Sequence, residues 1–278
     1  MRAAQIDWIA GVEDRHWWFA ARRSIVSALA GRLAQGRRLS VLDIGCGTGG
    51  NSGALSDAHD VLGVDAAREA IDAATARFPR ARFARAATRE ETLSHVAGRD
   101  LVLMMDVLEH VEDDFEFLSQ VVARLRPGAH LLATTPADPT LWSAHDEASC
   151  HWRRYEAERL AAAWDGLPVE TRLFQALNWR LAPLVRGARA LNRRLGRVSG
   201  GAGTDMRIPP TPVNALLQAV FAGEGLRLIH ELDHERKPTR RGVSWIAVLR
   251  RGEGECIERT RPAEIPPDQH RPALVQQN

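Results

Sequence analysis

The sequence feature that most constrains the fold is a glycine-rich stretch at residues 45–50, Gly-Cys-Gly-Thr-Gly-Gly. It follows an apolar run at 39–44 that is typical of a buried strand, and it opens a segment with helical character. Glycines are needed where a chain turns sharply and where a ligand must approach its backbone closely. The stretch therefore predicts a strand–turn–helix unit with a ligand site at the turn.

Short apolar runs alternate with helix-like segments from residue 39 to residue 134. The clearest helical pattern lies at 111–125, where apolar residues recur at spacings of four, three, four and three. Several runs are almost continuously apolar, as expected for strands that are buried on both faces. This alternation predicts an α/β fold with a doubly wound, parallel sheet. The predicted strands of this part are residues 39–44, 60–65, 81–87, 100–105 and 129–135.

The second half of the chain is less regular. We expect a helix at 155–164, strands at 168–175 and 243–251, and two helical stretches between 176 and 222. The predicted organisation is an N-terminal helical cap (1–36), an α/β core (37–175), a helical insertion or lid before the last strand (176–222), the C-terminal part of the core sheet (223–251) and a disordered tail (252–278).

Composition excludes several classes of protein. Of the 278 residues, 45% are hydrophobic and 26% are charged, which excludes a wholly disordered or fibrous chain. The formal net charge of +2 indicates no nucleic-acid partner. The three cysteines show no paired spacing, so we expect no metal site. No apolar run is long enough for a signal peptide or a membrane span, and we expect a cytoplasmic protein.

The glycine stretch alone leaves the ligand open. As G-x-G-x-x-G, through Gly45, Gly47 and Gly50, it fits a dinucleotide and hence an NAD(P)-dependent oxidoreductase. As D-x-G-x-G-x-G, beginning at Asp43, it indicates a different adenosine cofactor, and a tight turn without a ligand is a third reading. Asp65 ends the second predicted strand about 20 residues after the loop, where a carboxylate can accept hydrogen bonds from ribose hydroxyls. Carboxylates at this place suit a cationic ligand better than a pyrophosphate, which they would repel.

Several ordered segments give the chain a resemblance to class I S-adenosylmethionine-dependent methyltransferases. They are VLDIGCGTGG at 41–50, GVD at 63–65, DLVLMMDVLEHVEDD at 100–114 and LRPGAHLLATTPA at 125–137. More narrowly, the chain resembles a small-molecule type that has HWWF before the glycine loop (16–19) and a histidine-rich segment ending in HWRRY after the fifth strand (145–155). The resemblance implies a Rossmann-like sheet of seven strands whose last strand is antiparallel, with S-adenosyl-L-methionine as the cofactor.

The resemblance also implies roles for individual residues. Asp43 and the loop hold the methionine part of the cofactor, Asp65 takes the ribose, and the segment after the fourth strand lies near the amino group and the methyl. The adenine contact stays unassigned, because Ala86-Ala87-Thr88-Arg89 stands where relatives carry a short acidic motif. The predicted cofactor-binding residues are Asp43, Gly45, Cys46, Gly47, Gly49, Asp65, Ala66, Met105, Asp106 and Val107.

Methyl transfer to an alcohol or phenol needs a base beside an aligned acceptor atom. Histidine suits this task near neutral pH, so His145 and His151 are the catalytic candidates, with Asp146 next to them. We therefore favour O-methylation of a small-molecule, glycan- or lipid-linked acceptor. N- or C-methylation, and a binding module without catalysis, stay open. The alternative for both histidines is that they fasten their loop to the following helix.

Four further residues are predicted to contact the acceptor, and each has a structural alternative. The aromatic cluster at 16–19 caps the cofactor pocket or anchors the N-terminal helix on the sheet. The arginines of the HWRRY segment clamp an anionic group or fasten the loop. The predicted acceptor contacts are Trp18, His110, Arg154 and Tyr155.

Charge is segregated along the chain. Residues 176–203 hold six arginines and no acid, with apolar residues at helical spacing, whereas residues 100–117 hold seven acids and no Lys or Arg. A basic amphipathic stretch forms a lid over the acceptor or lies on an anionic membrane, here through 176–198, and both readings stay open. The arrangement predicts an acceptor with anionic character and leaves the oligomeric state open.

Overall fold

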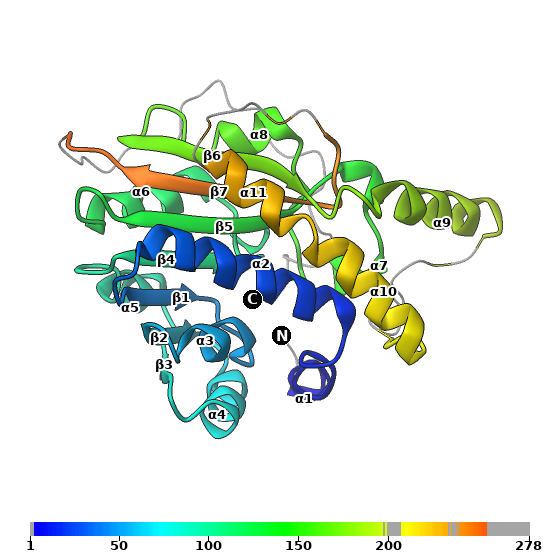
Figure 1. The fold of residues 1–278 in the computed structure, drawn as a ribbon, viewed down its shortest axis with the longest axis horizontal. Helices are drawn as coiled ribbons and strands as arrows, with labels where there is room; N and C mark the ends of the chain where they lie inside the picture. The colour runs from blue at the N-terminus through cyan, green and yellow to red at the C-terminus, as the bar shows by residue number, and fades with distance from the viewer. Residues whose placement is uncertain are drawn as a thin grey trace.

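The computed structural model describes residues 3–254 apart from 197, 199–206, 233, 235–237 and 239. Its strands are β1 (Ser40–Ile44), β2 (Asp60–Asp65), β3 (Arg82–Arg85), β4 (Leu101–Met105), β5 (His130–Pro136), β6 (Val169–Leu177) and β7 (Ser244–Arg251). They form one sheet in the order β3-β2-β1-β4-β5-β7-β6 (Figure 1), and among these strands only β7 runs in the opposite direction to the others. This confirms the predicted α/β fold with a doubly wound, mostly parallel sheet of seven strands.

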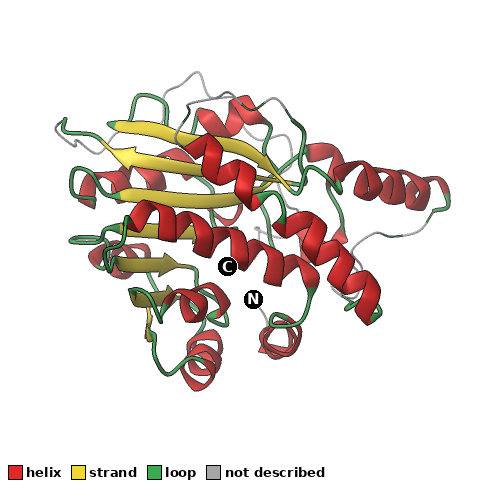
Figure 2. Cartoon of the chain, in the orientation of Figure 1, coloured by secondary structure: helices red, strands yellow, loops and turns green. Residues whose placement is uncertain are grey.

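Helices cover both faces of the sheet, as Figure 2 shows. They are α1 (Ala3–Val12), α2 (Trp17–Ala34), α3 (Gly50–Leu55), α4 (Arg68–Arg77), α5 (Arg89–Ser94), α6 (Asp114–Arg124), α7 (Ala144–Ala148), α8 (Ala157–Ala161), α9 (Ala182–Arg194), α10 (Thr211–Ala222) and α11 (Gly225–Leu232), with the 3-10 turns η1 (Leu108–His110) and η2 (Pro139–Leu141). Residues of α2, α10 and α11 share a core with Val41 and Leu103 of the sheet. Residues of α5, α6 and α8 pack against Leu42 and Met104 on the other face.

The predicted N-terminal helical segment is broken into two helices. His16 has extended backbone between them, and its ring nitrogen accepts the Trp18 N–H at 3.3 Å, which caps α2. Trp17 and Trp18 pack on Phe221 of α10, with ring centroids 6.1 and 5.0 Å from its own. The aromatic cluster therefore docks α2 on α10, which favours the anchoring alternative over a cap on the cofactor pocket.

Two other elements differ from expectation. Residues 225–232 form α11, although only the strand 243–251 was expected beyond residue 222. The buried residues of α11 (Gly225, Leu228, Glu231 and Leu232) have helical spacing, but the segment is too short for its period to stand out. The strand expected at 81–87 is shortened to β3, because at the edge of the sheet only β2 offers it hydrogen bonds.

The remaining expectations concern the ends of the chain and the membrane. The predicted tail at 252–278 lies outside the described residues from 255 onward. Within the part of the chain that the structure describes, no helix combines the length and the apolar character that crossing a bilayer requires.

The packing of α10 predicts a large loss of stability when Phe221 is truncated. Phe221 is fully buried between α2 and the sheet, so Phe221→Ala should lower the free energy of unfolding by about 3–5 kcal/mol. Leu226 on α11 is 80% exposed and serves as the matched control, because Leu226→Ala should change that free energy by less than about 0.5 kcal/mol. Urea denaturation measures both, and equal losses would contradict this packing.

Candidate active site

The motifs meet at one edge of the sheet, where the parallel strands end. The glycine loop follows β1, and Asp65 ends β2. The loop 137–156 after β5 carries both catalytic candidates, His145 and His151. Open α/β sheets bind their ligands at this edge.

The glycine loop adopts backbone conformations that favour glycine. The φ angle is +66° at Gly45, +53° at Gly47 and +86° at Gly49. A Cβ added at Gly45 would lie 2.8 Å from Cγ2 of Val107, and one at Gly49 would lie 2.9 Å from Cβ of Ala74. A Cβ at Gly47 would meet open space instead. A ligand can therefore approach the backbone at Gly47, as a nucleoside cofactor requires.

Two carboxylates hold the loop in this shape. Asp65 accepts the Gly47 N–H at 3.0 Å, which ties the end of β2 to the loop. Glu13 accepts the Thr48 hydroxyl at 2.6 Å and the Gly50 N–H at 3.1 Å, so it closes the N-terminal segment onto the first turn of α3. Glu13 was not predicted from the sequence, because it precedes the loop by more than 30 residues and belongs to no motif.

Asp43 of β1 is a buried carboxyl group with one free oxygen. Its Oδ2 accepts the Ser52 hydroxyl at 2.6 Å, and its Oδ1 has no hydrogen-bond partner among the described residues. Burial raises the pKa of Asp43 to about 7, although the Ser52 hydrogen bond and the Arg22 charge oppose that rise. A cationic ligand at this edge would stabilise the ionised form.

Arg22 of α2 reaches the end of β4 and pairs with Asp106. Asp106 has a φ of +57°, and its other carboxylate oxygen accepts the Thr134 hydroxyl at 2.9 Å. Burial acts to raise the pKa of Asp106, but the Arg22 charge, together with the hydrogen bonds from Thr134 and Arg22, holds the pKa below its usual range. Arg22 was not predicted from the sequence, where the available signal was its place one helical turn after Trp18.

Cys46, Ala66 and Met105, which were also predicted to bind the cofactor, lie at the same edge of the sheet. The Cys46 N–H donates to the Val64 carbonyl at 3.1 Å, and burial raises the pKa of the Cys46 thiol well above its ordinary value, which keeps it un-ionised. Met105 is buried at the end of β4, and the Ala66 carbonyl accepts the Arg85 Nε–H at 3.1 Å. Contact of these residues with a cofactor stays a prediction.

His151 and Asp146 form a buried pair in the loop after β5. His151 Nδ1 lies 2.9 Å from Asp146 Oδ1, so Nε2 is the nitrogen of the ring that is left for another partner. The His110 ring lies 4.7 Å from the His151 ring, and the His145 ring lies 6.1 Å from it. Burial acts to raise the pKa of Asp146, but His151 and Arg154 hold it well below its usual range.

Glu109 adds a fully buried carboxyl group to this cluster. Neither of its carboxyl oxygens has a hydrogen-bond partner within the described residues. Burial, and to a lesser extent the Asp106 charge, raises the pKa of Glu109 well above the ordinary value. Potential ligand atoms of Glu109, His110 and His151 all lie within 4.8 Å of one another. No metal site was expected from the sequence, but this spacing would suit a metal ion as well as a proton relay.

Arg154 and Tyr155 fasten the loop. Arg154 donates to both carboxylate oxygens of Asp146, at 2.8 and 3.0 Å. The Tyr155 hydroxyl donates to Asp114 at 2.9 Å, and Arg153 donates to two backbone carbonyls after η1 at 2.6 Å. Tyr155 has no exposed surface, which favours the fastening alternative, and its contact with an acceptor stays a prediction. The fastening alternative accounts for all three side chains.

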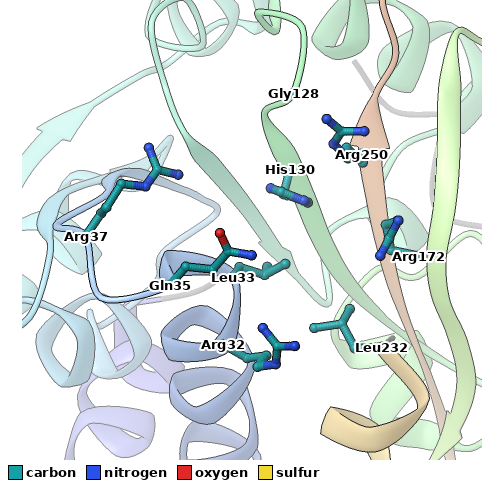
Figure 3. Close-up of a pocket in the computed structure, with 9 residues that line it drawn as sticks. All are labelled: Arg32, Leu33, Gln35, Arg37, Gly128, His130, Arg172, Leu232 and Arg250. Atoms are coloured by element: carbon teal, nitrogen blue, oxygen red, sulfur yellow. The ribbon is translucent and has the colours of Figure 1, made fainter. Parts of the chain in front are cut away.

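A separate basic cleft of about 350 Å³ lies at the opposite edge of the sheet (Figure 3). His130 at the start of β5 lines it with Arg172 and Arg250. Glu170 pairs with both arginines, at 2.9 and 3.5 Å. Burial, and to a lesser extent the Arg250 charge, lowers the pKa of His130 to about 4. The cleft is remote from the glycine loop and is not part of the candidate active site.

Comparison with known proteins agrees with the geometry of this edge. A family model described as a methyltransferase domain matches residues 15–181. A "probable S-adenosylmethionine-dependent methyltransferase" of Mycolicibacterium smegmatis is 35% identical over 133 residues, which cover 46% of this chain and 49% of the relative. A ubiquinone biosynthesis O-methyltransferase of Bordetella avium is 36% identical over 115 residues, which cover 40% of this chain and 46% of the relative. The chain thus spans about half the length of the curated relatives it matches.

Solved structures show the same fold at low sequence identity. A "putative sarcosine dimethylglycine methyltransferase" from Galdieria sulphuraria aligns with a TM-score of 0.51 at 11% identity, over 82% of this chain and 84% of its own. A structure described as a complex between the Haloferax volcanii Trm112 methyltransferase activator and "the putative methyltransferase" aligns with a TM-score of 0.50 at 15% identity, over 91% of this chain and 95% of that chain. At this identity the likeness concerns the fold.

The buried Asp43 carboxyl predicts a specific pH dependence of stability. Its pKa rises from 3.8 in the unfolded chain to about 7 in the folded protein, so the folded state binds more protons between these values. Its contribution to stability is therefore lost as the pH rises through that window, by roughly 2–4 kcal/mol. Asp43→Asn should remove this loss, so the variant should gain stability relative to the unchanged protein at pH 8 but not at pH 4.

Thermal or urea unfolding at the two pH values measures this difference. Asp57→Asn is the matched control, because the Asp57 side chain is exposed and, among the described residues, pairs only with exposed Arg80. The same pH response in the Asp43 variant and the unchanged protein would contradict the assignment.

Proposed function

This chain belongs to the methyltransferase domain family, and we propose that it transfers a methyl group from S-adenosyl-L-methionine to an oxygen atom of a small-molecule, glycan- or lipid-linked acceptor. The main support for this proposal is that the glycine loop and the Asp146–His151 pair lie at the same edge of the sheet. Both belong to the residues 15–181 that match the family model. The domain match favours methyl transfer over the hydride transfer of an NAD(P)-dependent enzyme.

The residues at this edge fit the cofactor. Bound S-adenosyl-L-methionine supplies a methyl group on a cationic sulfur. The open backbone at Gly47 admits the ligand, and Asp65 beside it would take the ribose hydroxyls. Asp43 with its free oxygen and Asp106, held ionised by Arg22, supply the negative charge that a cationic group requires.

His151 is the base in this proposal. Its Nε2 takes the proton of the acceptor hydroxyl, and Asp146 at Nδ1 fixes the tautomer and stabilises the imidazolium that forms. The buried Asp146 is itself held by Arg154 and by the Ser143 N–H at 2.9 Å, so the imidazole is pre-oriented before an acceptor binds. His145, whose ring lies 6.1 Å from that of His151, is not assigned the role of the base in this proposal.

The anionic character expected of the acceptor has little support from the arginines that prompted it. Arg154 is engaged by Asp146. In the insertion, Arg186 pairs with Asp138 at 2.9 Å, and Arg193 donates to the Thr140 carbonyl at 3.2 Å. We therefore do not include a charge on the acceptor in the proposed function.

Substitution of the two loop histidines tests the base. His151→Ala should lower kcat by about 10²–10⁴-fold and leave S-adenosylhomocysteine affinity unchanged. His145→Ala is the matched control and should retain most of the rate. The assay follows labelled methyl transfer into cell extract until an acceptor is identified, and full activity of the His151 variant would rule out this base.

Chelation distinguishes a base from a metal centre at the same cluster. If His151 acts as a base, protein treated with EDTA and dialysed should keep its full methyl-transfer rate. Loss of the rate, with recovery on adding a divalent cation, would instead assign Glu109, His110 and His151 to a metal site.

A further inference from the structure

Helix α9 carries an apolar stripe that faces away from the protein. In Figure 1 the helix extends from one end of the molecule, on the side of α7 and α10. Leu184, Leu191 and Leu195 are 65%, 56% and 53% exposed. Their spacings of seven and four place them on one face, because a helix turns by about 100° per residue. Three exposed leucines in a single row are unusual for a surface helix that only meets water.

The opposite face of α9 is basic and is bonded to the protein. Arg186 pairs with Asp138 at 2.9 Å and donates to the Gly242 carbonyl at 3.3 Å. Arg189 donates to the Leu141 carbonyl, and Arg193 donates to the Thr140 carbonyl at 3.2 Å. These bonds fix the rotation of the helix about its axis. The leucine row is therefore turned outward by a defined set of contacts.

The surroundings of the row favour one kind of occupant. The described residues of 182–222 include Arg194 and Arg207, both exposed, and no Asp or Glu. On α10, at the same end of the molecule, Val213 and Leu216 are also exposed. A second copy of the chain would bring arginines against arginines, which is unfavourable. An anionic lipid surface instead offers an apolar interior beneath negative headgroups.

We propose that α9 docks this protein on an anionic lipid bilayer, with Leu184, Leu191 and Leu195 inserted at the interface. The arginine contacts join α9 to η2, in the same loop after β5 that carries His151. Docking through α9 therefore brings the candidate active-site edge close to the lipid surface. This inference is independent of the reaction that the edge catalyses.

Vesicle co-sedimentation of the full chain tests the proposal. The unchanged protein should sediment with vesicles of phosphatidylglycerol and phosphatidylcholine, and much less with phosphatidylcholine alone. The combined variant Leu184→Gln, Leu191→Gln and Leu195→Gln should bind the anionic vesicles at least about tenfold more weakly. Glutamine retains helix propensity, and an unchanged melting temperature shows that the variant is folded.

Leu226→Gln is the matched control, because Leu226 is the most exposed of these leucines at 80% but lies on α11. It should bind vesicles as the unchanged protein does. Absence of binding to anionic vesicles, or equal binding by the triple variant, would overturn the proposal. A dimer in gel filtration that the triple variant abolishes, without vesicle binding, would also overturn it and assign the row to a second copy. The measurement needs neither cofactor nor acceptor, so a failed methylation assay leaves its outcome unaffected.

Discussion

Hydrogen bonds from the glycine loop to two carboxylates are the interactions on which the rest of this edge depends. Asp65 ties the loop to β2, and Glu13 ties the N-terminal segment to the start of α3. Glu13 also pairs with Arg77 of α4 at 2.6 Å, so three segments distant in sequence meet at one side chain. Glycine adopts the positive φ angles of the loop without strain, and these bonds hold the loop in that one conformation.

Buried charge organises the acceptor side of the edge in a similar way. Asp146 is fully buried and accepts hydrogen bonds from Ser143 and Arg154, besides its contact with His151. Desolvating these groups costs free energy. The network offsets that cost because both carboxylate oxygens of Asp146 accept hydrogen bonds. A loop with little regular structure can thereby hold a histidine in one orientation. Glu109, buried without such partners, is the group at this edge that most requires a ligand or a proton.

The sequence predicted those parts of the molecule that depend on local patterns. Apolar runs located the strands, and the glycines located the turn, because strand burial and positive φ angles restrict the residue types that fit. Glu13 and Arg22 were missed because their partners lie far along the chain, and a long-range ion pair leaves no periodic signal. Tyr155 was assigned to the acceptor on the basis of its motif, whereas its burial against Asp114 depends on tertiary packing. The same limit applies to α9, whose basic amphipathic pattern was visible but whose outward-facing row was not.

Calorimetric titration of S-adenosylhomocysteine into the full chain tests the central claim most directly. We propose that the glycine loop, held by Glu13 and Asp65, is the nucleoside site of a methyltransferase. We therefore expect saturable binding of one S-adenosylhomocysteine per chain, weakened by Asp65→Ala, and no heat of binding with NAD. Absence of S-adenosylhomocysteine binding, or binding of NAD in its place, would contradict it.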